Sequence, residues 1–110
     1  MASNQSFVDY AVGQLNAHGE VIAKKMFGEY GLYFEGKFFA LICDNKLFIK
    51  PTAAGKAYLK NPVEAVPYAG AKPRYLIEEQ LEDRAWLSEL ARITAAALPE
   101  PRPKKKKTKK

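Results

Sequence analysis

The chain has few of the residues from which metal centres and disulfide scaffolds are built. Its 110 residues include one cysteine, Cys43, and one histidine, His18. One cysteine cannot form an internal disulfide. Cys43 and His18 together supply only two ligands, too few for a zinc site. Cys43 also lies in the most apolar run of the chain, where burial raises the pKa of a thiol and makes it inert. We therefore expect no metal, no cofactor and no catalytic Cys–His pair.

Long hydrophobic runs are also absent. The longest unbroken apolar stretch, residues 38–43, is far shorter than the roughly 20 residues that a membrane-spanning helix needs. The N-terminal sequence MASNQSFVD has neither the basic segment nor the apolar segment of a signal peptide. We expect a cytoplasmic protein with no membrane partner.

Phosphate-binding and acid–base motifs are missing as well. The three glycines of MFGEYGLYFEGKFFALIC (26–43) fit neither GxxxxGK[ST] nor GxGxxG, and strand-like sequence follows them instead of a helix. Four carboxylates cluster around a predicted helix start, where capping and solvation explain them: Glu78, Glu79, Glu82 and Asp83. The sequence therefore predicts a protein that is not an enzyme.

Positive charge is concentrated at the C-terminus. Seven of the 18 basic residues and one of the 12 acidic residues lie beyond Pro99, which leaves the rest of the chain neutral. The basic residues of this tail are Arg102, Lys104, Lys105, Lys106, Lys107, Lys109 and Lys110. We predict a domain over 1–98 and a disordered Pro/Lys-rich tail over 99–110. Such a tail attracts DNA or RNA without base specificity, and the alternative is that it only solubilises the protein.

The pattern of apolar residues and turn signals predicts an α+β domain. We expect helices from residue 6 to about 19, over 53–60 and over 81–98. We expect strands over 21–27, 30–34, 37–43, 46–50 and 75–79, and a loop rich in proline and glycine over 66–73. The order is α-β-β-β-β-α-β-α, with three helices flanking a small antiparallel sheet of about four to five strands.

Two-residue turns at Glu35-Gly36 and Asp44-Asn45 fix which strand residues share a face. One predicted face carries no charge and is the expected floor for the helices: Gly31, Tyr33, Phe38, Ala40, Ile42, Leu47 and Ile49. The other face mixes apolar side chains with lysines: Tyr30, Leu32, Phe34, Lys37, Phe39, Leu41, Cys43, Lys46, Phe48 and Lys50. A slip of one residue in the pairing would exchange the two faces.

The second face is too apolar to be left in water, and three explanations stay open. A further helix or the 66–73 loop could cover it, with the lysines at its rim. A second copy of the chain or another protein could bind it, since large exposed apolar patches usually mark contacts. A single-stranded nucleic acid could stack on its aromatic side chains.

The order of these segments resembles a known family. KKMFGEYGLYFEGKFFALICDNKLFIKPT, PYAGAKPRYLI and LEDRAWLSELARITAAAL are similar to the N-terminal domain of the TfoX/Sxy family, from about residue 6 to residue 98. The most characteristic positions are Met26, Phe27, Gly28, Tyr30, Gly31, Tyr68, Gly70 and Lys72. The resemblance implies an α+β fold and no catalytic residues.

The best-known members of this family regulate natural competence in bacteria, and they promote transcription of DNA-uptake genes together with a cyclic-AMP receptor protein. Those regulators have a second, C-terminal domain, whereas this sequence continues after Leu98 only with PEPRPKKKKTKK. We therefore expect a stand-alone regulatory or adaptor module that binds a protein partner or itself through the sheet. The alternative is a small-ligand-binding domain whose pocket includes Tyr30, Tyr68 and Lys72.

Overall fold

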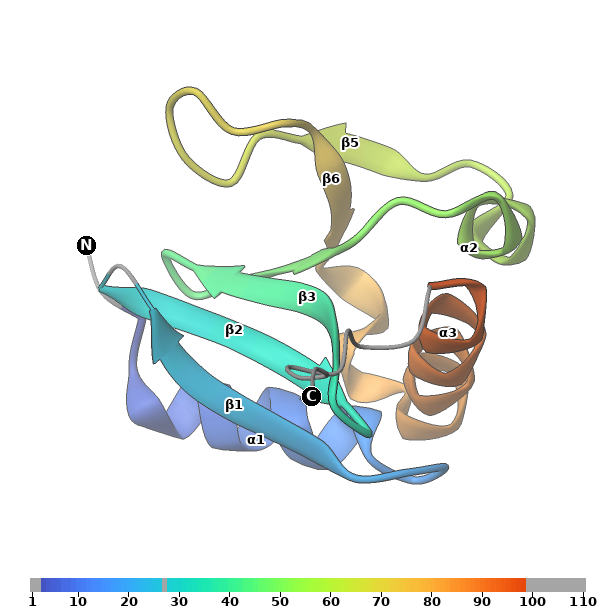
Figure 1. Cartoon of the computed structure of the whole chain (residues 1–110), viewed down its shortest axis with the longest axis horizontal. Coiled ribbons are helices and arrows are strands. Elements are labelled where there is room, and N and C mark those ends of the chain that lie inside the picture. Colours follow the sequence, from blue (N-terminus) through green and yellow to red (C-terminus); the bar gives the residue numbers. More distant parts are fainter. Residues whose placement is uncertain (1–2, 27, 99–110) are drawn as a thin grey trace, which may run out of the picture.

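Three α-helices and one antiparallel sheet make up the part of the chain that the computed structural model describes, residues 3–26 and 28–98 (Figure 1). Phe27 and the basic tail lie outside the described residues. The helices are α1 (Gln5–Leu15), α2 (Ala53–Leu59) and α3 (Arg84–Ala97), with a short 3-10 helix, η1 (Glu79–Glu82), before α3. The strands are β1 (Val21–Met26), β2 (Glu29–Phe34), β3 (Lys37–Cys43), β4 (Lys46–Ile49), β5 (Val63–Ala65) and β6 (Arg74–Ile77). The predicted α+β class is confirmed.

The sheet has six strands in the order β1-β2-β3-β4-β6-β5, slightly more than the four to five expected. The additional strand is β5, which pairs with β6 and forms an edge of the sheet. It follows Pro62 directly and has only three residues, too few for an alternating pattern to be recognised in the sequence. A proline just before the first residue of an edge strand is compatible with pairing, because no ladder hydrogen bond is lost.

Both predicted hairpin turns are present, and their backbone conformation explains their sequences. Glu35 and Gly36 have φ of 50° and 86°, and Asp44 and Asn45 have φ of 53° and 57°. Two consecutive residues with positive φ form the turn whose twist matches that of the flanking strands. Glycine, asparagine and aspartate tolerate this conformation best, and they occupy three of the four positions: Gly36, Asp44 and Asn45.

The main core lies between one face of the sheet and the two longer helices (Figure 1). We call this the helix-covered face. The fully buried residues of α1 and α3 include Val8, Leu15, Leu87 and Leu90, and they pack against Leu32, Ile42, Leu47 and Ile49 of the strands.

Polar contacts hold α3 across the end of α1. The buried Ser88 hydroxyl donates to the Gln14 carbonyl at 3.0 Å and accepts from the Ala17 N–H at 3.1 Å. The helix starts later than the predicted residue 81, because η1 precedes it and Asp83 caps it by accepting a hydrogen bond from the Trp86 N–H at 3.1 Å. Capping by Asp83 provides a partner for one of the free N–H groups at the helix start.

A β-bulge in β3 overturns part of the predicted face assignment. Tyr33 pairs with Phe38 but Leu32 pairs with Ala40, so Phe39 is an extra residue in β3. A bulge of this kind places two consecutive residues opposite one partner and shifts the alternation of side chains beyond it. Phe39 and Ala40 are accordingly both fully buried in the main core.

The faces therefore exchange on one side of the bulge, as a slip of one residue requires. Five residues expected on the second face instead pack toward the helices: Tyr30, Leu32, Phe34, Lys37 and Phe39. Three residues expected in the main core lie on the opposite side: Gly31, Tyr33 and Phe38. Leu41 and Phe48 lie on that side as predicted.

Lys37 shows why a charged residue can be accommodated on the helix-covered face. Its Nζ donates to the carbonyl oxygens of Ala95 at 3.1 Å and Leu98 at 3.4 Å. These carbonyls lie at the C-terminal end of α3, where the helix dipole favours a cation, and the Ala95 carbonyl also accepts from the Leu98 N–H at 3.1 Å.

The two neighbouring phenylalanines of β3 provide a test of the bulge. Phe39→Ala should lower the free energy of unfolding by about 3–5 kcal/mol, because it leaves a cavity in the core where the Phe39 ring meets Phe34 edge-on at 6.1 Å. Phe38→Ala should cost about 1 kcal/mol, since Phe38 is only partly buried. Urea unfolding of both variants measures the two losses. A larger loss for Phe38→Ala than for Phe39→Ala would contradict the bulge and support the regular pairing.

Candidate functional site: a cleft on the open face of the sheet

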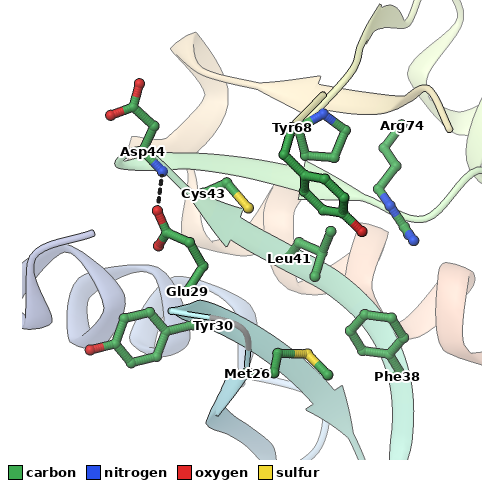
Figure 2. A pocket seen from close by; sticks show the side chains of 10 residues that line it. Met26, Glu29, Tyr30, Phe38, Leu41, Cys43, Asp44, Tyr68 and Arg74 are labelled. Carbon is green, nitrogen blue, oxygen red and sulfur yellow. Dashed lines mark hydrogen bonds between the residues drawn. The ribbon is translucent and has the colours of Figure 1, made fainter. Parts of the chain in front are cut away.

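The side of the sheet opposite α1 and α3 is hollowed by a cleft of about 780 Å³. We call this side the open face. The cleft lies within the size range of small-molecule sites, roughly 300–1,000 Å³. Its walls come from β1, β2, β3, the β3–β4 turn, the loop before β6 and β6 itself (Figure 2). The lining residues are Met26, Glu29, Tyr30, Phe38, Leu41, Cys43, Asp44, Pro67, Tyr68 and Arg74.

Gly31 shapes the floor of this cleft. A Cβ atom at this position would lie 2.5 Å from the Met26 sulfur and 3.0 Å from a ring carbon of Phe38. Only a residue without a side chain allows Met26 and Phe38 to approach each other over β2. They adjoin a second apolar cluster formed by Leu41, Cys43 and Phe48, which makes the floor largely hydrophobic.

Cys43 lies at the floor of the cleft as a buried free thiol. Burial raises its pKa, and the nearby Glu29 carboxylate adds to the effect. A thiol in such surroundings is mostly protonated near neutral pH and is a poor nucleophile. Within the described part of the chain, no group of three or more histidine, cysteine or acidic side chains could hold a metal ion.

Glu29 ties one end of the cleft together. One carboxylate oxygen accepts from the Asp44 N–H at 2.8 Å (Figure 2), which joins β2 to the β3–β4 turn. The other accepts from the Ser3 N–H at 3.0 Å, which joins β2 to the N-terminal segment. Burial acts to raise the pKa of Glu29, but the hydrogen bonds from Asp44 and Ser3 outweigh it and lower the pKa below its ordinary value. Glu29 is therefore a structural anion at neutral pH.

Arg74 lies across the cleft from Glu29 and Asp44 (Figure 2). Its guanidinium carbon is 5.7 Å from the centre of the Phe38 ring, a cation–π distance. Nη1 of Arg74 is buried and has no hydrogen-bond partner among residues 3–26 and 28–98. Leaving such a donor unpaired costs roughly 1–3 kcal/mol. The cleft thus has a cationic side and an acidic side.

A second group of side chains lies beside the cleft on the open face. We call it the aromatic patch: Ile22, Lys24, Tyr33, Phe38 and Lys50. The rings of Tyr33 and Phe38 are 5.4 Å apart, and the ammonium groups of Lys24 and Lys50 lie over them at 5.1 and 5.6 Å. Ile22 pairs with Tyr33 across β1 and β2 and is 43% exposed.

The structure brings together only part of the pocket expected from the sequence. Tyr30 and Tyr68 both line the cleft, whereas Lys72 is not among the lining residues. The Tyr30 ring points toward α1, where its hydroxyl donates to the side chain of Gln5 at 3.2 Å. Of the family-like positions, Met26, Tyr30 and Tyr68 thus border one cleft, and Gly31 supports its floor.

Sequence reasoning did not identify Glu29 or Arg74 as site residues. Each is a single charge next to an apolar or aromatic stretch, which is the only signal that the sequence offers. Lys46, expected on the second face, is exposed at the start of β4. The seven basic residues of the tail lie outside the described residues.

In the described ranges, none of the helices combines the length and the apolar character needed to cross a bilayer.

The chain does have recognisable relatives. A family model described as "TfoX N-terminal domain" matches residues 13–98. An uncharacterized 12.7 kDa protein in the trpE 5′ region of Spirochaeta aurantia is 40% identical over 109 residues, which cover 99% of this chain and 95% of that protein.

The hydrogen bonds to Glu29 predict a pH-dependent contribution to stability. Glu29→Gln should lower the free energy of unfolding at pH 7 by about 1 kcal/mol, because the amide loses the charge that accepts both N–H groups. Since the folded pKa is lowered, this contribution is complete above the unfolded pKa of about 4.3 and is lost as the pH falls through the folded value.

Urea unfolding between pH 7 and pH 3 measures the gap between the wild type and Glu29→Gln, which should narrow below about pH 4.3. Glu64→Gln is the matched control, because Glu64 is exposed on β5. A gap that stays constant with pH would show that Glu29 is not the anion described above.

Proposed function

The chain belongs to the TfoX N-terminal domain family, and from this premise we propose that it is a non-catalytic regulatory or adaptor module. It acts in the bacterial cytoplasm by contact with another protein and associates with nucleic acid through its basic tail. Its regulatory role is of the kind that the family's best-known members have, in the control of transcription and competence.

The aromatic patch is the observation that carries this proposal. Tyr33 and Phe38 are partly exposed, Ile22 is 43% exposed, and Lys24 lies over the Tyr33 ring. Aromatic side chains are enriched in protein interfaces, and an exposed apolar patch is a usual mark of a contact site. Neither α1 nor α3 covers this side of the sheet (Figure 1).

The face of β1, and not its edge, is the surface offered to the partner. Among the described residues β1 pairs only with β2, so its other edge is unpaired. Lys24 and Lys25 are both exposed in this strand. Lysines on an edge strand oppose the addition of another strand, which leaves side-chain contact with the face as the favoured mode.

The tail gives the module a second, nonspecific attachment. Its seven basic residues follow a neutral domain, so the attraction to phosphates is confined to the last eleven residues. If about six of these charges neutralise phosphates, the logarithm of affinity should fall against the logarithm of salt concentration with a slope near −5. This contact carries no base specificity.

Capture from extracts of the source cell tests the two attachments separately. Ile22→Glu places a charge in the aromatic patch and should abolish capture of the protein partner while the fold is kept, because Ile22 lies on the exposed surface. Val63→Glu is the matched control: Val63 is 60% exposed on β5, the opposite edge strand, and the variant should capture as the wild type does.

A chain that ends at Leu98 should retain the protein partner and lose DNA and RNA at low salt. Nuclease treatment should leave the protein capture unchanged. Equal capture by Ile22→Glu and the wild type would contradict the role of the patch, and equal nucleic-acid retention without the tail would contradict the role of the tail.

A further inference from the structure

We propose that the cleft on the open face binds a small organic anion, a carboxylate with an apolar body, whose charged group pairs with Arg74. This inference rests on the cleft alone and does not depend on the proposed protein partner. It also differs from the pocket expected from the sequence, which placed Lys72 at the site.

Arg74 supplies the charge that such a ligand needs. Its guanidinium lines the cleft, makes no ion pair within residues 3–26 and 28–98, and keeps Nη1 buried without a hydrogen-bond partner. A planar guanidinium matches the geometry of a carboxylate and binds it through two parallel hydrogen bonds. A ligand carboxylate would therefore provide the acceptor that the protein does not.

The rest of the cleft fits an apolar body. Phe38 and Leu41 of β3 and Met26 of β1 form the floor, and Tyr68 reaches over it from the loop before β6 (Figure 2). Tyr68 is 58% exposed, so its ring is accessible to a ligand in the cleft. A cavity of about 780 Å³ with mostly apolar walls and few polar groups is typical of small-molecule sites.

The charges at the opposite side determine the orientation of the ligand. Asp44 and the anionic Glu29 repel a negative group there, and both Glu29 oxygens already accept hydrogen bonds from the backbone. The carboxylate is thus directed to Arg74, and the apolar body extends over Leu41 toward Met26 and Cys43. The same acidic side disfavours a nucleic-acid strand, whose phosphates would have to pass it.

A matched pair of probes tests the charge. Titration of the ¹⁵N-labelled full chain with 2-naphthoate should shift the amide signals of Met26, Leu41 and Tyr68, and the neutral 2-naphthamide should bind more weakly. Arg74→Gln should raise the dissociation constant of 2-naphthoate about tenfold, because the loss of a hydrogen bond to a charged group typically has an effect of this size. The dissociation constant of 2-naphthamide should not change.

Two further variants keep the test decisive. Lys72→Gln is the control, because it removes a cation from the loop before β6 that does not line the cleft. This variant should bind both probes as the wild type does. Tyr68→Ala alters an exposed side chain that the fold does not need and should weaken both probes, which tests the cleft even if Arg74→Gln does not fold. The proposal is overturned by absent binding at millimolar probe, by equal affinity for the two probes, or by shifts confined to other surfaces.

Discussion

The β-bulge at Phe39 is the constraint on which the rest of the structure depends. Because one extra residue stands in β3, Phe39 and Ala40 both face the helices, and Phe38, just before them, faces the opposite side. The ring of Phe39 enters the main core, while that of Phe38 is placed beside Tyr33 on the open face. Two consecutive phenylalanines thus contribute to opposite sides of the sheet, Phe39 to the core and Phe38 to the proposed binding surface.

The open face follows from this arrangement. The cleft needs Phe38 on its floor, and Gly31 provides the space that lets Phe38 and Met26 meet there. Glu29 joins β2 to the β3–β4 turn at one end, and Arg74 brings a cation from β6 to the other. Segments that are far apart in the chain therefore contribute opposite charges to one largely apolar cleft.

Much of the architecture could be predicted from local signals, and the face assignment could not. Each hairpin turn contains a residue that tolerates positive φ, Gly36 in one and Asp44 with Asn45 in the other, so the hairpins were recognisable. The bulge has no such signal, because Phe38 and Phe39 are equally apolar and either can fill a core. Arg74 could not be assigned to a site for a related reason: its role depends on strand pairing between β4 and β6.

Interstrand nuclear Overhauser contacts between β2 and β3 test this account most directly. The bulged register predicts contacts that pair Leu32 with Ala40 and Tyr30 with Ile42, alongside Tyr33 with Phe38. A regular hairpin would instead pair Leu32 with Phe39 and Tyr30 with Leu41. The first pattern supports both the core and the cleft as described, and the second would place Phe39 on the open face and contradict them.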